Sequence, residues 1–289
     1  MTVITASNIK KTYPTKPPVE ALKGLSLEVK ESKCVALLGP NGAGKTTFLR
    51  ILTGILLPDD GSITVYDKNP LNSSAEVSSL LRFLPETPFL LQNNSLWENG
   101  YFWFSYWNEP FPKDNLKEIL ERFNLINRAK EPLSRYSRGM MQKAALSIML
   151  ATRAPVIILD EPTLGLDVTT KREVIEMIID LKKKEKTIIV ASHDMPFVEK
   201  IADHIALINN GKIVEMTEIS DFKERHGNLR YLLTYRKNGK LYKEIFHENT
   251  ECNFRLRNIL SDNDIEIVEV HQECDSLEEI LNRLLIDGR

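Results

Sequence analysis

Short apolar runs alternate with amphipathic segments along the first two thirds of the chain. The runs are Val35–Leu38, Val156–Leu159 and Thr187–Ala191. Apolar runs of this length are typical of strands that are buried on both faces of a sheet. Between the last two runs, apolar residues recur at helical spacing within Thr170–Lys184. A strand, a helix and a second strand in this order predict a right-handed parallel crossover.

The segments around this pattern have a different character. The stretch up to about Val65 predicts strands and turns. Residues 87–152 are rich in aromatic residues and helical patterns and contain few strand signals. We therefore expect a mainly helical subdomain, about residues 87–152, inserted into an α/β sheet domain. Ile205–Ile208 and Lys212–Glu215, joined by an Asn-Asn-Gly turn, predict a hairpin near the end of that domain.

The pattern changes again at about residue 218. Arg230–Tyr235 and Leu241–Phe246 alternate around an Asn-Gly turn, which predicts a second hairpin. Ile265–Val270 predicts another strand, and Leu277–Leu285 predicts an amphipathic helix. The sequence thus predicts two domains: residues 1–217, and a small α/β accessory domain at residues 218–289.

Composition narrows the class of protein. The formal net charge is −2, so no overall basic field indicates a nucleic-acid partner. The three cysteines are scattered, with neither metal-ligand spacing nor a disulfide framework, which favours a reduced, cytoplasmic compartment. The first residues lack the apolar core of a signal peptide, and no apolar run approaches the roughly 18 residues of a membrane helix. We expect that any membrane role requires another chain.

The segment Gly39–Thr47 (GPNGAGKTT) follows the first apolar run and fits the pattern G-x-x-x-x-G-K-[ST]. Glycines let the backbone bend so that successive N–H groups point at phosphate oxygens, and the following helix adds its positive end. In such a loop Lys45 reaches the β- and γ-phosphates, and Thr46 offers its hydroxyl to Mg²⁺. We expect ATP to contact Gly39, Pro40, Asn41, Gly42, Ala43, Gly44, Lys45, Thr46 and Thr47.

Two carboxylates, Asp160 and Glu161, directly follow the run Val156–Leu159. Ligands of open α/β folds lie at the carboxyl ends of the strands. We expect Asp160 to hold Mg²⁺, directly or through water, and Glu161 to polarise the attacking water. A solvent-facing acid pair is the alternative, and the upstream phosphate loop favours the functional interpretation. His193 follows the strand TIIVA and is expected to meet the γ-phosphate from the same edge.

The string YSRGMMQK, Tyr136–Lys143, precedes the small and apolar residues Ala144–Ala151. Ser137 and Gly139 are placed either to cap this helix or to form an anion site at its start. The residues alone leave both interpretations open.

With this string, the chain resembles the ATP-binding subunits of ABC transporters. YSRGMMQK corresponds to the family signature, usually written LSGGQ, and the resemblance covers about residues 1–217. It implies a P-loop NTPase sheet core that binds ATP and Mg²⁺. It further implies that Tyr13 stacks on adenine, and that Leu164–Asp167 (LGLD), with Asp167, contacts a second subunit. The terminal segment Ser276–Leu285 resembles a subgroup of single-domain export ATPases that carry a small C-terminal domain.

The resemblance also implies a dimer, most simply of two copies of this chain. Ser137, Gly139 and Met140 of one subunit would contact the ATP held by the other. A polytopic membrane permease would insert a short helix into a groove between Glu86 and the helical subdomain, holding the chain at the inner face of the membrane. The candidates for the floor of this groove are Phe89, Trp97 and Tyr101–Trp107, and each is explained equally well as core of the helical subdomain.

The chain departs from the family pattern at several positions. Glu86 stands where glutamine is usual, and we expect it still to approach Mg²⁺, now as a charged ligand. Tyr136, Arg138 and Met140 replace the usual leucine, glycine and glutamine of the signature. Arg138 either adds a cation near the partner's nucleotide or is a solvated side chain, and the sequence favours the second interpretation.

Three functions remain to be compared. The first is a subunit that hydrolyses ATP to drive a membrane permease, with export as the expected direction. The second is a soluble ABC-type ATPase acting on a ribosome or nucleic acid, which the single nucleotide domain and the absence of a basic surplus disfavour. The third is a regulatory module that binds ATP without hydrolysis, which Glu161 and His193 disfavour.

Overall fold

The computed structural model describes residues 1–72, 74–260, 262 and 264–287. The chain forms two compact units, Met1–Thr217 and Glu218–Arg289. Each unit has its own sheet and its own apolar core. Among the described residues, no helix is long and apolar enough to pass through a lipid bilayer.

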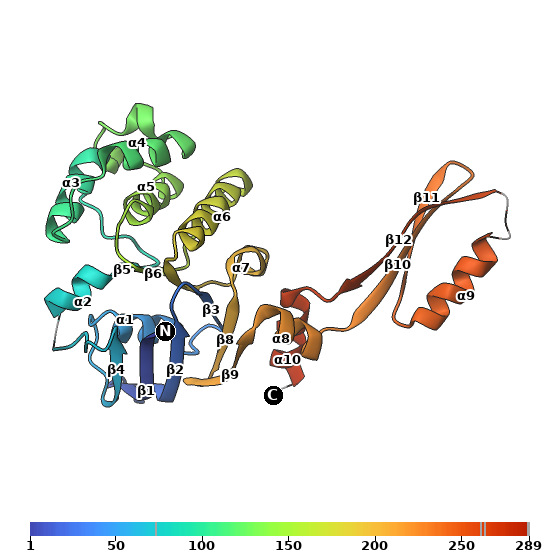
Figure 1. Ribbon diagram of the computed structural model, residues 1–289, viewed down its shortest axis with the longest axis horizontal. Coiled ribbons are helices and arrows are strands. Elements are labelled where there is room, and N and C mark those ends of the chain that lie inside the picture. The colour runs from blue at the N-terminus through green and yellow to red at the C-terminus, as the bar shows by residue number, and fades with distance from the viewer. Residues whose placement is uncertain (73, 261, 263, 288–289) are drawn as a thin grey trace. The chain divides into compact units, whose positions relative to one another are not determined.

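A six-stranded sheet, ordered β5-β6-β7-β3-β8-β9, forms the centre of the first unit (Figure 1). Its strands are β3 (Cys34–Leu38), β5 (Leu81–Leu84), β6 (Val156–Asp160), β7 (Thr187–Ala191), β8 (His204–Asn209) and β9 (Lys212–Glu218). β5, β6, β7, β3 and β8 pair in parallel. Every residue of β3, β6 and β7 is buried. The predicted α/β core of parallel, doubly covered strands is therefore confirmed.

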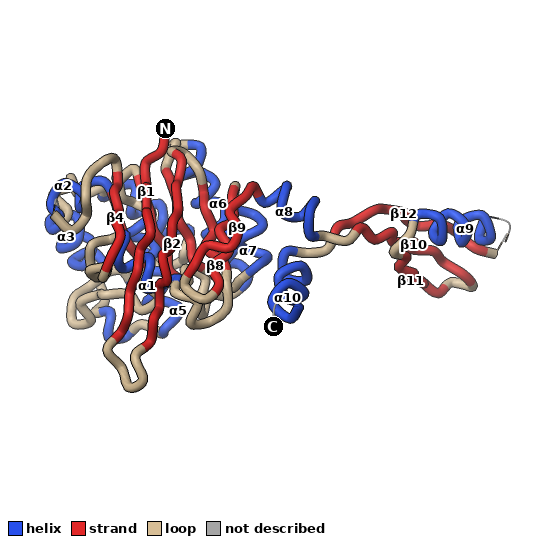
Figure 2. Tube along the Cα trace, turned by 90° about the horizontal axis from the view of Figure 1, so that it is seen from below, coloured by secondary structure: helices blue, strands red, loops and turns tan. Residues whose placement is uncertain are grey.

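A second, antiparallel sheet of the order β2-β1-β4 completes the first unit, and its strands lie side by side in Figure 2. These strands are β1 (Thr2–Tyr13), β2 (Val19–Lys30) and β4 (Asp60–Val65). Helix α1 (Lys45–Leu52) contacts β2, β4 and β6, so it packs against both sheets. Its Phe48, Leu49, Ile51 and Leu52 are fully buried. Burial of each such side chain stabilises the fold by about 1.5–3 kcal/mol, which holds the start of α1 in place.

Helices fill the chain between β5 and β6. They are α3 (Leu96–Tyr106), α4 (Lys113–Arg122) and α5 (Arg138–Leu150), with short 3₁₀ turns at Ile126–Arg128 and Leu133–Arg135. Figure 1 shows these three helices grouped together. Ser95 and Glu98 form a reciprocal capping box that starts α3. The remaining helices of this unit are α2 (Ser74–Leu80), α6 (Val168–Lys183) and α7 (Met195–Ile201).

A buried ion pair joins these helices to the large sheet. Arg82 of β5 is only 1% exposed and pairs with Glu109, which follows α3. Glu109 also accepts hydrogen bonds from the Thr152 hydroxyl at 2.8 Å and the Arg153 N–H at 3.0 Å, just before β6. The Arg82 guanidinium lies 4.6 Å from the centre of the Trp107 ring. Burial lowers the pKa of Arg82, and Glu109 opposes that effect.

The second unit contains a three-stranded antiparallel sheet of the order β11-β10-β12. Its elements are α8 (Ile219–His226), β10 (Leu229–Lys237), β11 (Lys240–Phe246), α9 (Asn249–Leu260), β12 (Ile265–Cys274) and α10 (Leu277–Asp287). Ile259 of α9 packs with Leu233 and Tyr235 of β10 to form the core. The sequence pattern predicted the strands and α10 but neither α8 nor α9, because both helices are mostly polar.

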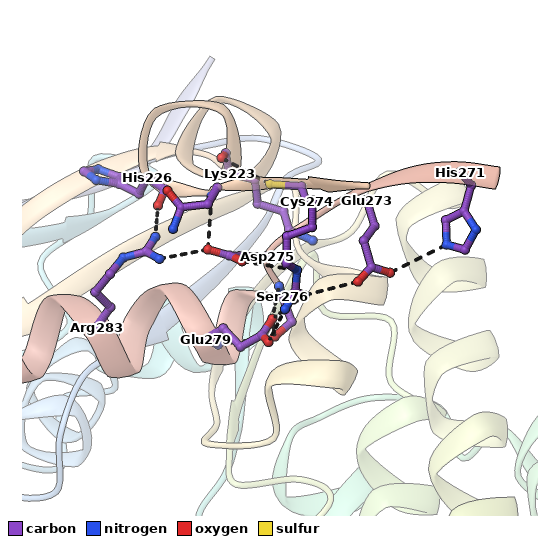
Figure 3. A network of polar contacts seen from close by, with 11 residues as sticks. Lys223, His226, His271, Glu273, Cys274, Asp275, Ser276, Glu279 and Arg283 are labelled. Atoms are coloured by element: carbon purple, nitrogen blue, oxygen red, sulfur yellow. Dashed lines mark hydrogen bonds and ion pairs between the residues drawn. The ribbon is translucent and has the colours of Figure 1, made fainter. Parts of the chain in front are cut away.

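Polar contacts join the two ends of the second unit (Figure 3). The buried carboxylate of Asp275 accepts a hydrogen bond from the Asn228 N–H at 3.0 Å and pairs with Arg283 at 2.9 Å. Ser276 and Glu279 cap each other at the start of α10: the Glu279 N–H donates to the Ser276 hydroxyl at 3.2 Å, and the Ser276 N–H donates to the Glu279 carboxylate at 2.8 Å. These contacts fix the entry to β10 against the entry to α10.

The Arg82–Glu109 pair yields a prediction about stability. Replacing Glu109→Ala leaves the Arg82 guanidinium buried without its counter-charge, and we expect the free energy of unfolding to fall by about 3–5 kcal/mol. Denaturant unfolding followed by tryptophan fluorescence measures this directly, because Trp97, Trp103 and Trp107 all lie in this region. The control is Glu121→Ala, which removes an exposed pair with Lys117 and should change stability by about 0.5 kcal/mol or less. Equal effects of the two substitutions would contradict the prediction.

Candidate functional site

The loop between β3 and α1 is held open by glycines that no other residue can replace without strain. Gly39 has a φ of 151°, and a Cβ there would lie 2.1 Å from the Ile208 carbonyl oxygen of β8. Gly44 has a φ of 108°, and a Cβ there would lie 2.7 Å from the Ala21 carbonyl oxygen of β2. The loop therefore passes in direct contact with backbone from both sheets, and its shape is fixed by the fold.

The polar side chains of the loop are already engaged. The Lys45 ammonium donates hydrogen bonds to the carbonyl oxygens of Gly39 at 2.7 Å and Pro40 at 3.1 Å. Burial lowers the pKa of Lys45, while the carboxylates of Glu161 and Asp160 oppose that shift. The Tyr13 hydroxyl lies 3.2 Å from the hydroxyl of Thr47. Tyr13 therefore contacts the phosphate loop directly, and we expect both to bind the same nucleotide.

Asp160 ends β6 beside the start of α1. Its side chain is 2% exposed, and its Oδ2 atom has no hydrogen-bond partner among the described residues. Burial raises the pKa of Asp160, Glu161 and Glu86 add to the rise, and a hydrogen bond with Thr46 acts against it. A buried carboxylate oxygen without a partner, next to a hydroxyl, fits a hard divalent cation. The donor set therefore suits Mg²⁺ held in part by phosphate oxygens.

Glu161 and His193 face each other across the ends of β6 and β7. The Glu161 N–H donates to the Ala191 carbonyl oxygen at 2.8 Å, which anchors its backbone. The Glu161 carboxylate accepts the His193 N–H at 3.3 Å and lies 2.8 Å from His193 Nδ1. Glu161 has a φ of 51°, a left-handed conformation that costs about 1–3 kcal/mol in a non-glycine residue. Such strain directly after a strand is typical of a functional position.

Except for His193, these groups open into one cleft of about 300 Å³. Its lining residues are Tyr13, Val19, Ala21, Asn41, Gly42, Ala43, Gly44, Lys45, Thr46, Thr47, Glu86, Asp160 and Glu161. Gly39 and Pro40 do not line it, and they contribute the carbonyl groups that bind Lys45. The structure thus gathers a cation, phosphate-binding backbone and three carboxylates around one space.

The signature residues lie elsewhere in the first unit. Ser137 caps α5, its hydroxyl accepting the Met140 N–H at 3.3 Å. A Cβ on Gly139 would lie 3.1 Å from the Gly165 carbonyl oxygen. Asp167 caps α6 through the N–H and hydroxyl of Thr170, which lowers its pKa to about 2. The start of α5 and the segment Leu164–Asp167 are therefore neighbours, but Ser137, Gly139 and Met140 do not line the cleft of their own chain.

Two further residues of the signature string have roles that the motif did not indicate. Gln142 is 4% exposed and donates to the Pro162 carbonyl oxygen at 3.2 Å, which joins α5 to the segment after Glu161. The Tyr136 hydroxyl donates to the Arg128 carbonyl oxygen at 3.0 Å, which accounts for a tyrosine at this position. The sequence does contain a signal for this role of Gln142, namely a polar residue next to the small and apolar residues of α5.

An apolar groove adjoins the cleft. Phe83, Pro85 and Phe89 line both of its parts, one of which extends to Trp103 and Trp107 and the other to Thr46, Glu86 and Asp160. Phe89 is 71% exposed. Of the other aromatic candidates for the floor, Trp97 packs edge-on against Phe111 and Tyr101 stacks on Phe111. Glu86 therefore lies where the groove meets the cleft.

Comparisons with known proteins match the chain to one family. The family model described as ABC transporter matches residues 22–164. The linearmycin resistance ATP-binding protein LnrL of Bacillus subtilis (strain 168) is 31% identical over 78% of this chain and 72% of its own length. A fluoroquinolones export ATP-binding protein of Mycobacterium tuberculosis (strain CDC 1551 / Oshkosh) is 29% identical over 82% of this chain and 78% of its own.

Among solved structures, a dimeric ATP-binding cassette in a post-hydrolysis state, bound to ADP and Pi, superposes with a TM-score of 0.67 at 23% identity. The match covers 75% of this chain and 98% of that one. At this identity the likeness shows the fold alone, namely that of a nucleotide-binding α/β cassette.

Asp160 provides a test of the site. Replacing Asp160→Asn removes a buried, partly uncompensated charge, so we expect the ligand-free chain to gain about 1–3 kcal/mol of unfolding free energy. The same change should remove the Mg²⁺ dependence of ATP binding, measured by calorimetry with and without Mg²⁺. Asp180→Asn, an exposed carboxylate of α6, is the control and should alter neither property. A destabilised Asp160→Asn chain that retains Mg²⁺-dependent binding would contradict this assignment.

Proposed function

Because the chain belongs to the ATP-hydrolysing, ATP-binding subunits of the ABC transporter family, we propose that two copies close around two MgATP and drive a separate membrane permease. The observation that carries the proposal is the shared cleft, in which the phosphate loop, Asp160 and Glu161 meet at one edge of a buried sheet, with His193 bound to Glu161 outside its lining. The expected direction of transport is export.

The cleft residues account for ATP hydrolysis. The N–H groups of the loop and the Lys45 ammonium bind the phosphates, and Tyr13 offers its ring to the adenine. Thr46 and Asp160, with Glu86 nearby, would hold Mg²⁺, which would supply positive charge beside the phosphates. Glu161 accepts the proton of the attacking water. His193, whose Nδ1 lies 2.8 Å from the Glu161 carboxylate, holds that base in position and approaches the γ-phosphate.

The position of the signature supports the proposed dimer. Ser137, Gly139 and Met140 have no access to the cleft of their own chain, so they serve a nucleotide only when a second subunit faces them. Asp167 and its neighbours then contact that subunit beside the signature. A structural neighbour with this fold is itself dimeric. ATP bound at both interfaces favours the closed pair because it contacts both chains only in that state.

The permease contact is assigned to the apolar groove. The exposed ring of Phe89 and the walls formed by Trp103 and Trp107 suit the apolar face of a short helix. Glu86 lines both this groove and the nucleotide cleft beside Asp160. A permease helix bound in the groove would therefore alter Mg²⁺ binding through Glu86. The chain is thereby held at the cytoplasmic face of the membrane. Export is supported by two relatives, a linearmycin resistance ATP-binding protein and a fluoroquinolones export ATP-binding protein.

Hydrolysis and dimer formation are tested together by Glu161→Gln. This change keeps the shape and hydrogen bonds of the side chain but removes the base, so ATP should bind and remain intact. We expect loss of at least about 100-fold in turnover, and an ATP-dependent dimer on size-exclusion chromatography. Glu118→Gln on α4 is the matched control and should hydrolyse ATP normally and remain monomeric after turnover. A Glu161→Gln chain with undiminished turnover would remove Glu161 from this role.

The groove assignment is tested by Phe89→Asp. A carboxylate in the groove opposes burial of an apolar helix face, so the permease partner should no longer co-purify with the chain. ATP-dependent dimer formation in the Glu161→Gln background should persist, since Phe89 does not line the nucleotide cleft. Phe102→Asp, at an exposed phenylalanine of α3 outside the groove, is the control and should retain the permease. Retention by Phe89→Asp, or co-purification of RNA in place of a membrane protein, would overturn the assignment.

A further inference from the structure

The backbone of Glu161 is held in a conformation that its local sequence does not favour. Its φ of 51° is left-handed, and the ring of the following Pro162 restricts the same backbone further. A strained conformation of this kind persists only where the surrounding structure fixes it. The Glu161 N–H donates to the Ala191 carbonyl oxygen of β7 at 2.8 Å, and the Leu164 N–H closes a turn onto the Glu161 carbonyl oxygen at 3.2 Å. These two bonds anchor the start of the turn to the sheet and its end to its start.

Gln142 of α5 supplies a third contact to this turn. Its side chain is 4% exposed, and its amide Nε2 donates to the Pro162 carbonyl oxygen at 3.2 Å, across 20 positions of the chain. A buried amide requires such a partner, whereas an apolar side chain of the same size would fill the space without one. Packing alone therefore does not account for a glutamine at this position, and the bond to the middle of the turn does.

Helix α5 is a rigid support for this contact. Every residue from Ala144 to Leu150 is buried, so the helix is fixed by packing directly after Gln142. Lys143 adds an ion pair with Asp167 at 3.5 Å, on the far side of the same turn. A side chain on a packed helix holds its partner in place more precisely than one on a loop.

Only a short length of backbone separates the carbonyl group that Gln142 holds from Glu161. The Pro162 ring fixes its own φ, and the peptide bond before it is planar. The ψ angles of Glu161 and Pro162 are therefore the soft rotations between that carbonyl group and the Glu161 Cα. Holding the carbonyl group limits where the Glu161 carboxylate can lie, and that carboxylate is 2.8 Å from His193 Nδ1.

We propose that Gln142 is a positioning residue for ATP hydrolysis, which orients the Glu161 carboxylate toward the attacking water through the Pro162 carbonyl group. This inference rests on the proposed role of Glu161 as the general base. Gln142 does not line the nucleotide cleft, so it acts through Glu161 and not on ATP. Without the bond, the turn relaxes from its left-handed conformation and the base moves away from the water. ATP binding depends on the phosphate loop and is unchanged.

Gln142→Met tests the contact, because it keeps the size of the side chain and removes the donor. We expect kcat for ATP hydrolysis to fall between about 10-fold and 100-fold, while KM for ATP changes by less than about twofold. Ser147→Ala is the matched control on the same helix, since it removes a buried hydroxyl that donates to the Lys143 carbonyl oxygen at 2.7 Å, within α5. Its kcat should equal that of the parent chain. A parental kcat for Gln142→Met, or an equal fall in both variants, would overturn the proposal.

A double substitution separates positioning from a general loss of structure. In the Glu161→Gln background, adding Gln142→Met should slow single-turnover hydrolysis by less than about twofold, because the base on which Gln142 acts is already absent. A further fall as large as in the parent chain would mean that Gln142 acts by another route, against the proposal. If Glu161→Gln alone retained full turnover, the base itself would be refuted, whereas a parental kcat for Gln142→Met refutes only the positioning. The two hypotheses therefore fail on different measurements.

Discussion

Burial of three parallel strands on both faces is the constraint from which the site follows. Ala191 of β7 is in register with Leu37 of β3 on one side and with Asp160 of β6 on the other. The residues that follow these strands must therefore emerge at one edge of the sheet. Slipping one strand by a residue would break this register and bury polar groups, which costs several kcal/mol. The phosphate loop, Glu161 and His193 thus meet because the core permits no other register.

This edge concentrates groups whose charges the fold only partly compensates. Burial lowers the pKa of Lys45, which Asp160 opposes, and burial raises the pKa of Asp160, which the cation of Arg50 opposes. Glu161 adds a left-handed backbone conformation. The core contributed by α1 and the two sheets offsets these local costs. A bound triphosphate, with the proposed Mg²⁺, would supply the missing partners, so that the stability lost in the ligand-free cleft would contribute to the binding free energy.

The sequence predicts features that depend on neighbouring residues, but it does not predict contacts between segments that are distant in the chain. The apolar runs predicted the buried strands, and the glycine spacing predicted the loop, because these depend on neighbouring residues. The strand order β5-β6-β7-β3-β8-β9 and the separate N-terminal sheet depend on contacts between distant segments. Arg82 and Glu109 meet across 27 positions, and an arginine within a strand resembles an exposed residue until its partner is known. The contact of Tyr13 with Thr47 escaped prediction for the same reason.

Helix α5 links the two halves of the proposed mechanism within one chain. At its start, Ser137 and Arg138 face outward, whereas Gln142, one turn later, bonds the backbone directly after Glu161. Lys143 and Asp167 add a second connection, to the segment that precedes α6. A shift of the helix start toward a partner's nucleotide must therefore be transmitted to the acid segment or break these contacts. Packed protein interiors deform little. In the proposed dimer, contact of the α5 start with the partner's ATP and the geometry of the chain's own acid segment would therefore change together.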